Sequence, residues 1–317
     1  MKAIFRISRF SKLLSLLTLW FLMAGTTQAA SPTIHFGTPP WPGLKVKTQV
    51  AETLLQALGY QTQAKKLGVP FIYRDLASGN LDAYLGGWMP TEKKMVDPLL
   101  ADHKVTNLGS NLSGGVIGLA VPDYVWDDGI HSVQDLTDHA ERFQSKIYGI
   151  ESGSEINNAV STAIKEDDEG MGQFNLVGSS TAVMLTQVKR AVSRHEPVVF
   201  IGWRPHWMNI DIKMRYLKGR KDSAVAGVKS HILTIVSNDL AENQPNVARF
   251  LSQVRIKTRT QSRWIYNYSY KKGDLETVAK NWLKTHPKTV KTWLEGVNTV
   301  DGSSGYQAYR KALNISG

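Results

Sequence analysis

Cysteine is absent from the 317 residues of the chain. This absence excludes disulfide bonds, thiolate metal ligands and a cysteine nucleophile, and it leaves no residue for a lipid anchor behind a signal peptide. The sequence also lacks a Gly-x-Ser-x-Gly nucleophile elbow, a His-Glu-x-x-His zinc motif and a Walker lysine loop. Its eight histidines do not follow the spacing of metal ligands. We therefore expect a protein that is not an enzyme and that holds neither a metal nor a cofactor.

Long apolar runs are scarce too, and the one near the N-terminus is too short to span a bilayer. Residues 13–24 are apolar and follow a basic leader, and residues 27–29 provide small side chains at a cleavage site. This order is typical of a secretory signal peptide, which we predict at residues 1–29 with cleavage near Ala29. The alternative is an uncleaved N-terminal anchor, although about 20 apolar residues are needed to cross a membrane.

Positive charge exceeds negative charge, with 38 Lys and Arg against 27 Asp and Glu. Four basic residues lie in the leader, so the mature chain keeps 34 basic against 27 acidic residues, a net charge of +7. A basic surface can bind nucleic acid, but an exported protein meets little of it, and the Lys and Arg residues are scattered along the sequence. We expect a solvated basic surface, no nucleic-acid partner, and a soluble location in the periplasm of a Gram-negative cell.

Strand-like and helix-like segments alternate along the mature chain. Residues 33–37 have the pattern of a strand, and a helical pattern follows that ends at Gly59, a residue suited to a left-handed helix cap. The strand-like segments LDAYLG, KIYGI, FNLVG and PVVFIGW each neighbour a helical pattern, with helices expected over residues 155–165 and 181–192. This alternation predicts an α/β fold with mainly parallel sheets.

Two further strand-like segments suggest how the chain divides. Residues 114–122 and 231–237 are apolar and flank the middle third of the sequence. In a two-lobed α/β protein the chain often leaves one lobe and returns to it through two such strands. We therefore predict one lobe from residues 31–116 and 229–317 and a second lobe from residues 117–228.

Three of the nine tryptophans follow strand-like segments. Trp41, Trp88 and Trp203 each stand just beyond such a segment, at the edge of an open α/β sheet where ligands bind. Three indole rings around one cleft suit a quaternary ammonium group, which has no N–H to donate and is attracted by cation–π interactions of roughly 0.5–2 kcal/mol per ring. The alternative is core packing, the usual role of aromatic residues. We expect Gly202 to let the backbone approach the cleft and Trp207 to pack beneath it.

Longer stretches around these tryptophans resemble a known family. The segments LASGNLDAYLGGWMPT, GWRPHWMN, SNDLAENQP and NWLKTHPKTVKTWLEGV are similar to choline- and glycine-betaine-binding proteins of ABC importers. The resemblance covers essentially the whole mature chain. It implies a two-lobed periplasmic-binding-protein fold (type II-like), with the ligand in the cleft between the lobes and the importer's membrane subunits as partners. By residue-wise match, Trp41, Trp88 and Trp203 are the walls of a cage around a trimethylammonium group.

Departures from the family pattern bear on the ligand. Choline-binding relatives have an Asp at the position of Gly43, a Tyr at about Ile117 and an Asn at Ser154. The missing Asp removes a charge partner for a cation, while Arg204 adds a partner for an anion, although it can equally be an exposed arginine on a turn. For His206, bracing of the turn and direct ligand contact both stay open. Together these changes favour a ligand with its own carboxylate, such as a betaine, without excluding choline.

The sequence thus predicts a monomeric substrate-binding protein that delivers a quaternary ammonium osmolyte or nutrient to an ABC importer. One alternative is a protein of the same fold that binds another cationic amine or an amino acid. A second is a protein that presents its ligand to a chemoreceptor. The last is an exported enzyme acting on a small amine, for which the chain shows no catalytic motif.

Overall fold

The computed structural model describes residues 32–315, of which residues 33–315 form one compact unit. The predicted signal peptide therefore lies outside the described residues. The strands are β1 (Thr33–Thr38), β2 (Gln61–Lys66), β3 (Ala83–Met89), β4 (Val105–Pro122), β5 (Lys146–Tyr148), β6 (Asn175–Val177), β7 (Phe200–Arg204), β8 (Met214–Tyr216) and β9 (Val228–Ser237).

Helices surround this sheet, and most lie between consecutive strands or in the C-terminal part of the chain. The α-helices are α2 (Pro42–Ala57), α3 (Val69–Ala77), α4 (Lys93–Ala101), α5 (Asp123–Asp127), α6 (Val133–Asp138), α7 (Glu155–Lys165), α8 (Thr181–Ser193), α9 (Met208–Asp211), α10 (Asn238–Asn243), α11 (Pro245–Gln253), α12 (Thr258–Ile265), α13 (Leu275–Thr285), α14 (Pro287–Trp293) and α15 (Gly305–Ala312). Two 3₁₀ segments, η2 (Ala140–Phe143) and η3 (Asp168–Gln173), and one π-helical turn, η4 (Tyr266–Tyr270), complete the described elements.

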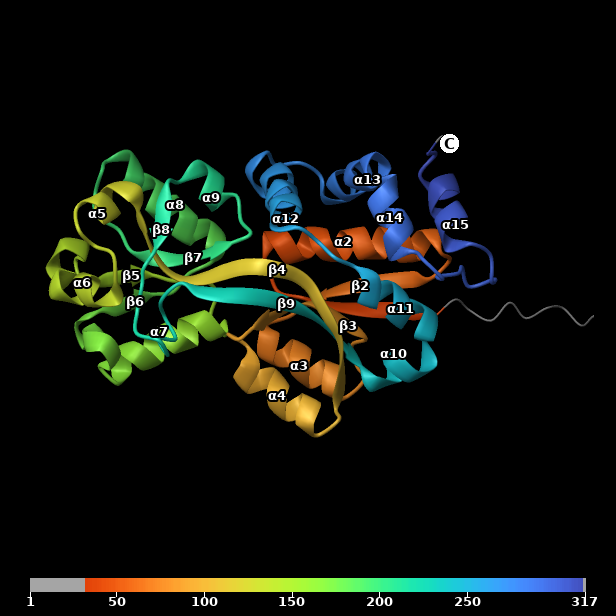
Figure 1. Ribbon diagram of the computed structural model, residues 1–317, viewed down its shortest axis with the longest axis horizontal. Coiled ribbons are helices and arrows are strands. Elements are labelled where there is room, and N and C mark those ends of the chain that lie inside the picture. Colours follow the sequence, from red (N-terminus) through yellow and green to blue (C-terminus); the bar gives the residue numbers. More distant parts are fainter. Residues whose placement is uncertain (1–31, 316–317) are drawn as a thin grey trace, which may run out of the picture. The chain divides into compact units, whose positions relative to one another are not determined.

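The strands form one mixed sheet in the order β2-β1-β3-β9-β4-β7-β5-β6, with β8 paired to β4. At its two ends the pairs β1–β2, β1–β3, β5–β6 and β5–β7 are parallel. In the middle, β4 and β9 run antiparallel to their neighbours and to each other. The predicted α/β class is confirmed, and the sheet is mixed because these two long strands pass through its centre (Figure 1).

Apolar side chains gather in two clusters along this sheet. The first draws on β1, β3, α2, α3 and the C-terminal helices, and the second on β5, β7, α7 and α8. Figure 1 shows α2 on one face of the sheet and α3 and α4 on the other, with β4 and β9 side by side between the two clusters. The lobe boundaries at residues 116/117 and 228/229 stay a prediction.

Local sequence explains where two of the helices begin or end. Helix α2 begins with Pro42 at its first turn, buries Leu54 and Leu55 on one face, and is followed by Gly59 at φ +92°, as expected for a left-handed cap. Helix α8 begins after Ser180, whose hydroxyl accepts a hydrogen bond from the backbone N–H of Val183. Both helices were predicted from periodicity.

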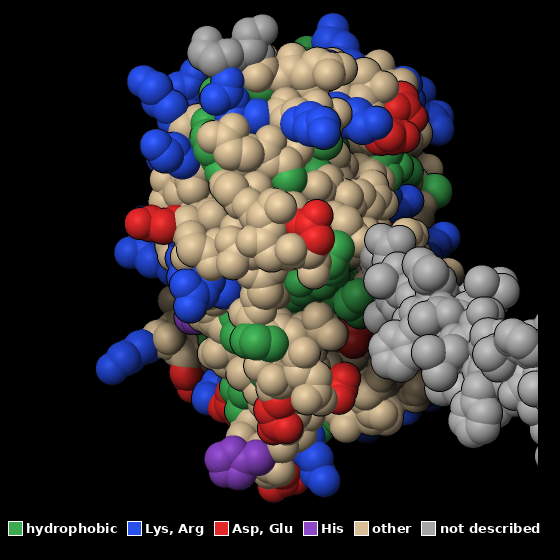
Figure 2. All heavy atoms as spheres, turned by 90° about the vertical axis from the view of Figure 1, so that its right-hand side faces the viewer, with side chains coloured by type: hydrophobic (Ala, Val, Ile, Leu, Met, Phe, Trp, Pro, Cys, Tyr) green, Lys and Arg blue, Asp and Glu red, His purple; other side chains and the backbone are tan. Residues whose placement is uncertain are grey.

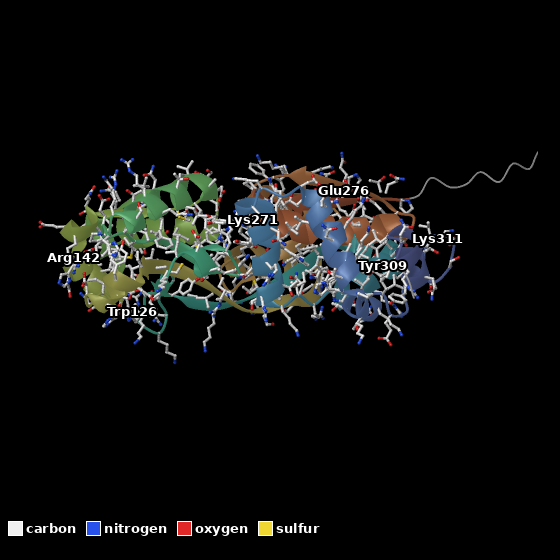
Figure 3. The ribbon with its side chains drawn as sticks, turned by 90° about the horizontal axis from the view of Figure 1, so that it is seen from above. Trp126, Arg142, Lys271, Glu276, Tyr309 and Lys311 are labelled. Atoms are coloured by element: carbon white, nitrogen blue, oxygen red, sulfur yellow. The ribbon has the colours of Figure 1, made fainter. Side chains whose placement is uncertain are left out.

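The last residue of α12, Ile265, belongs to the second hydrophobic cluster, and the following turn η4 packs against that cluster. In η4, the Tyr270 hydroxyl donates to Asp211 Oδ1 at 3.1 Å, and the Tyr270 ring lies 5.0 Å from that of Trp207. The ammonium of Lys189 pairs with Asp211 at 2.8 Å and lies over both rings. Lys271 directly follows Tyr270, and Figure 3 places it where the part of the fold that carries the first hydrophobic cluster meets the part that carries the second.

Two further observations concern membrane-spanning helices and the surface charge. Among residues 32–315, no helix has both the length and the apolar character needed to cross a membrane. Figure 2 shows the end of the unit around α15, where Lys and Arg side chains are spread over the upper part and the sides with Asp and Glu among them. The basic residues of this face therefore do not form a single patch.

Candidate functional site

The three tryptophans singled out by sequence come together around one cavity. Trp41 is the residue before α2, Trp88 lies near the end of β3, and Trp203 lies near the end of β7. Because β3 and β7 flank the central strands β9 and β4, their tryptophans approach the cavity from opposite sides. Trp88 and Trp203 also share a local pattern, since each is followed two residues later by a proline after a cis peptide bond, Pro90 and Pro205.

The cavity has a volume of about 50 Å³, several times the ~10–15 Å³ that one water molecule needs on the same measure. Its walls are mainly aromatic and aliphatic. The aliphatic part is formed by Leu44, Ile117, Ile150, Ile156, Ile232 and Ile265. A small molecule with an apolar outer surface would be enclosed here with few hydrogen bonds to its apolar end.

Four buried polar atoms on residues lining this cavity have no hydrogen-bond partner within residues 32–315. They are Trp41 Nε1, Ser154 Oγ, His206 Nε2 and Gln261 Oε1. Leaving a buried polar group unpaired costs about 1–3 kcal/mol each, so such groups are rarely left without a partner. Three of the four can donate a hydrogen bond, so a ligand that carries an acceptor would find donors in this cavity.

His206 is the best-defined of these donors. Its ring is 1% exposed, and its Nδ1 accepts a hydrogen bond from the backbone N–H of Met208 at 3.2 Å. A neutral ring that accepts at Nδ1 carries its proton on Nε2. Burial lowers the pKa of His206 to about 3, so the ring stays neutral near pH 7 and its Nε2–H is a donor without a partner. The ring also packs 4.9 Å from that of Trp203.

Two helix N-termini face the same cavity. Gly43 and Leu44 in the first turn of α2 line it, as do Glu155 and Ile156 in the first turn of α7. The first N–H groups of a helix have no partner inside the helix, and the aligned peptide dipoles favour a negative charge there. The preceding residue Ser154 makes no side-chain cap to α7. In α2, Pro42 has no N–H and the N–H of Leu44 donates to Trp41 O at 3.1 Å, so the first turn of α7 offers more N–H donors to an anionic group than that of α2 does.

Three ionisable side chains also reach the cavity, and sequence reasoning missed all of them. The ammonium of Lys47 donates to Leu85 O at 3.0 Å and Asn111 Oδ1 at 2.6 Å, and burial lowers its pKa to about 7. The carboxyl of Glu92 accepts from the Tyr73 hydroxyl at 2.7 Å. Burial raises the pKa of Glu92 to about 8, although this hydrogen bond opposes the rise.

Glu155 is the third of these charged residues and lies at the first position of α7. Its side chain is half-buried, and Asn158 donates to its Oε1 at 3.1 Å. The negative charge of Glu155 contributes to the raised pKa of Glu92, which indicates that the two carboxyl groups lie near each other. No positively charged side chain pairs with Glu155 within residues 32–315. Its carboxylate is therefore available to a cationic ligand.

We expect Glu92→Gln to change how stability depends on pH. Between about pH 4.5 and pH 8 the folded protein keeps a proton on Glu92 that the unfolded chain releases. Because the folded state then binds more protons, stability falls as pH rises through this window. Glutamine does not titrate, so the unfolding free energy of the wild type relative to the variant should fall by up to about 1.4 kcal/mol per pH unit. Urea unfolding of both proteins across the window measures this difference. The titration of His206 and Lys47 affects both proteins equally and therefore cancels in it. A constant difference would mean that Glu92 is ionised in the folded protein.

Seven of the eight residues predicted to bind ligand line the cavity. They are Trp41, Gly43, Trp88, Ile117, Ser154, Trp203 and His206. Arg204 does not line it, since its exposed side chain lines a separate groove on the other side of His206. The geometry thus supports no contact between Arg204 and a ligand in the cavity, and this part of the prediction needs revision.

Two glycines behave differently from expectation. A side chain at Gly202 would meet the methyl of Met214 at 2.6 Å and Cβ of Ala120 at 3.0 Å, so Gly202 makes room for neighbouring strands and not for ligand. At Gly43, a side chain would meet Ile265 Cδ1 at 2.8 Å and Gln261 Nε2 at 3.0 Å. Helix α12 therefore occupies the space into which an acidic side chain at Gly43 would point.

Two further residues of the site could not be found by sequence reasoning. Gln261 and Ile265 lie one turn apart on α12 and both line the cavity. Their signal is only the ordinary periodicity of a helix, in which buried positions recur every three to four residues. Glu155 could have been found more easily, because it directly follows Ser154, which the sequence analysis had already named as a ligand-binding residue.

Comparison with known proteins adds independent information. Residues 32–285 match the family described as the substrate binding domain of ABC-type glycine betaine transport systems. A glycine betaine/carnitine transport binding protein of Listeria monocytogenes is 32% identical over 165 residues, which cover 52% of this chain and 54% of that protein. The chain therefore aligns with about half the length of this relative.

Solved structures are similar over most of the chain. An ABC-transporter choline-binding protein in complex with choline is 33% identical, with a TM-score of 0.85, and the match covers 89% of this chain and 98% of that one. Lactococcal OpuAC, in its closed conformation with glycine betaine, is 26% identical with a TM-score of 0.74, covering 83% of this chain and 99% of that one. These similarities to two-lobed binding proteins agree with the observed α/β architecture.

Proposed function

The chain belongs to the family of substrate-binding domains of ABC-type glycine betaine transport systems, and on that premise we propose that it binds a quaternary ammonium compound in the tryptophan-lined cavity. Members of this family are transport proteins and not enzymes. The observation that carries the proposal is the convergence of Trp41, Trp88 and Trp203 on one cavity. Three indole faces attract a cation that has no N–H to donate, by roughly 0.5–2 kcal/mol per ring.

The remaining lining supports a zwitterionic ligand. Its ammonium end would lie among the indole rings, and its carboxylate would accept from His206 Nε2–H, from the Gly43 N–H in α2 and from the N–H groups that begin α7. A hydrogen bond to a charged group contributes about 1.5–3 kcal/mol. Together with the glycine at position 43, these donors favour a betaine over choline. Glu155 partly offsets this preference, since its carboxylate offers a choline-like cation a charge partner.

Transport is the physiological setting that we propose. Substrate-binding proteins of this family are extracytoplasmic and work with membrane transporter subunits. We propose that this chain is exported to the periplasm by a cleaved signal peptide, acts as a monomer, and closes two lobes around its ligand before delivering it to those subunits. Trp41 and Trp88 would belong to the first lobe and Trp203 to the second, so a bound ligand would hold both together. Presentation of the ligand to a chemoreceptor would use the same binding site.

A thermal-shift panel tests the ligand class. The panel contains glycine betaine, proline betaine, carnitine, choline, acetylcholine and polyamines. A ligand at about 100 times its dissociation constant should add about 2.7 kcal/mol to the unfolding free energy. We expect betaines to give the largest shift, choline a smaller one, and polyamines none, because primary and secondary ammonium groups need hydrogen-bond acceptors that the indole faces lack. Stabilisation by polyamines alone would contradict the proposal.

A further inference from the structure

A second hollow adjoins the tryptophan-lined cavity and differs from it in character. This groove has a volume of about 580 Å³ and shares His206 with the cavity. On one side it is lined by the last residue of β7 and by residues that follow it, and on the other by α12. Arg204 comes from the first side, and Arg259 and Arg263 come from the second. We refer to this hollow as the arginine groove.

The three arginines of the groove have no acidic partner. Within residues 32–315, none of their side chains takes part in an ion pair or a side-chain hydrogen bond, whereas Arg74, Arg142 and Arg215 elsewhere in the fold are paired with carboxylates. Arg259 and Arg263 are four residues apart on α12 and therefore lie on the same face of the helix.

The acid nearest along the chain to the groove-lining residues is already engaged. Asp211 follows Ile210, which lines the groove, but its carboxylate pairs with Lys189 at 2.8 Å and accepts from the Tyr270 hydroxyl. Asp211 therefore does not balance the positive charge of the three arginines. All three arginines are exposed, and an anion bound between them would reduce their mutual repulsion.

The floor of the groove is an ordered polar network. Asn209, which lines the groove, donates to Trp203 O at 2.8 Å and His206 O at 3.2 Å and accepts from the Tyr216 hydroxyl at 2.8 Å. The charge of Arg204 acts on the same Tyr216, lowering its pKa against the larger rise caused by burial. These contacts hold the first side of the groove, next to the end of β7, in a fixed arrangement.

We infer that the arginine groove is a binding site for a phosphate group, either as a free ion or as an ester. Guanidinium groups form paired, charge-assisted hydrogen bonds to phosphate oxygens, and three unpaired guanidiniums in one hollow supply the opposite charge to such a group. Asn209, Thr258 and Ser262 supply further polar groups around it. Phosphate bound here would contact both β7 and α12.

Position links the groove to the cavity. The ring of His206 lies 4.9 Å from that of Trp203 and lines both hollows. If the two sides of the groove belong to lobes that close on a quaternary amine, as proposed above, closure brings Arg204 towards the arginines of α12. Phosphate would then favour closure and raise the affinity for the amine, and by linkage the amine would raise the affinity for phosphate by the same factor. This coupling rests on the proposed function, whereas phosphate binding itself does not.

Calorimetry with inorganic phosphate tests the site directly. Phosphate is titrated into the mature chain at constant ionic strength, with and without saturating glycine betaine. We expect saturable binding of one phosphate per chain, tighter when glycine betaine is present. The double variant Arg259→Gln/Arg263→Gln should bind phosphate at least about tenfold more weakly, because each guanidinium–phosphate contact contributes roughly a tenfold to hundredfold factor. The variant Arg190→Gln, which changes an exposed arginine of α8 outside the groove, should bind as the wild type does.

A parallel titration with phosphocholine distinguishes the two sources of the phosphate group. If the ester binds more tightly than choline and this gain disappears in the double variant, the groove holds a phosphate carried by the ligand. If inorganic phosphate binds beside glycine betaine, the groove holds a free ion. Absence of saturable binding in every titration, or an equal loss in Arg190→Gln, would overturn the inference. Because phosphate is also titrated without amine, the two proposals can fail separately. If the cavity does not bind an amine, phosphate still binds alone, whereas if the groove is not a phosphate site, glycine betaine binds and phosphate does not.

Discussion

Trp88→Ala should weaken the binding of glycine betaine by at least about tenfold while the fold remains intact. Trp88 is only half-buried, lines the cavity, and packs against both hydrophobic clusters. Removal of its indole deletes one face of the cage, a loss of roughly 0.5–2 kcal/mol of cation–π attraction in addition to the packing around the ligand. Calorimetry measures the affinity, and thermal unfolding without ligand measures stability.

Trp264→Ala is the matched control for this experiment. Trp264 is 1% exposed, packs edge-on against Trp282 at 4.9 Å, and does not line the cavity. Truncation of such a core tryptophan costs about 3–5 kcal/mol of stability and should leave the affinity of the folded fraction nearly unchanged. If Trp88→Ala instead bound normally and melted much lower, Trp88 would be a core residue and not a wall of a binding site.

His206→Phe should separate betaines from choline. Phenylalanine keeps an aromatic ring between Trp203 and Trp207, which lie 4.9 Å and 5.3 Å from the histidine ring, but it has no N–H. A carboxylate that accepts from Nε2–H loses one charge-assisted hydrogen bond of about 1.5–3 kcal/mol. Glycine betaine should therefore bind roughly tenfold to hundredfold more weakly, while choline, which has no carboxylate, should change much less.

The experiment compares the affinities of glycine betaine and choline for the wild type and for His206→Phe. Each ligand is titrated into the wild type and the variant at the same pH, where the buried ring of His206 is neutral because its pKa lies at about 3. If both ligands lost the same factor, the ring would act by holding Trp203 in place and not as a donor. An unchanged affinity for glycine betaine would place the carboxylate elsewhere, among the N–H groups of α2 or α7.

Much of the fold could be predicted because local patterns agree with it. Helix α7 occupies the predicted residues 155–165, and the strand-like segment that contains Trp203 became β7. Strand β2 was missed because all its residues except Ala64 are polar and it pairs at the sheet edge with β1 alone. A strand exposed in this way has no hydrophobic alternation to find. The antiparallel pairing of β4 with β9 joins segments far apart in sequence, which local patterns do not encode.

The candidate site shows the same division between local and distant information. Trp88 and Trp203 could be placed because the ends of strands in an open α/β sheet meet at its ligand-binding edge. Gln261 could not, because nothing in the sequence of α12 shows that the helix reaches across to Gly43. The role given to Gly202 was wrong for a related reason. Its Cα faces Met214 and Ala120 on neighbouring strands, and strand pairing of this kind cannot be read from the residue itself.

The most direct test of the central claim compares choline with its neutral isostere 3,3-dimethyl-1-butanol, in which carbon replaces the charged nitrogen. The two molecules have nearly the same shape, so burial of apolar surface is matched and only the cation–π and charge terms differ. Calorimetric titration of both into the wild-type protein should show choline binding at least about tenfold more tightly, since each of the three rings contributes roughly 0.5–2 kcal/mol of cation–π attraction. Equal affinities, or no binding of choline or glycine betaine at any concentration tested, would contradict the assignment of Trp41, Trp88 and Trp203 as a cage for a quaternary ammonium group.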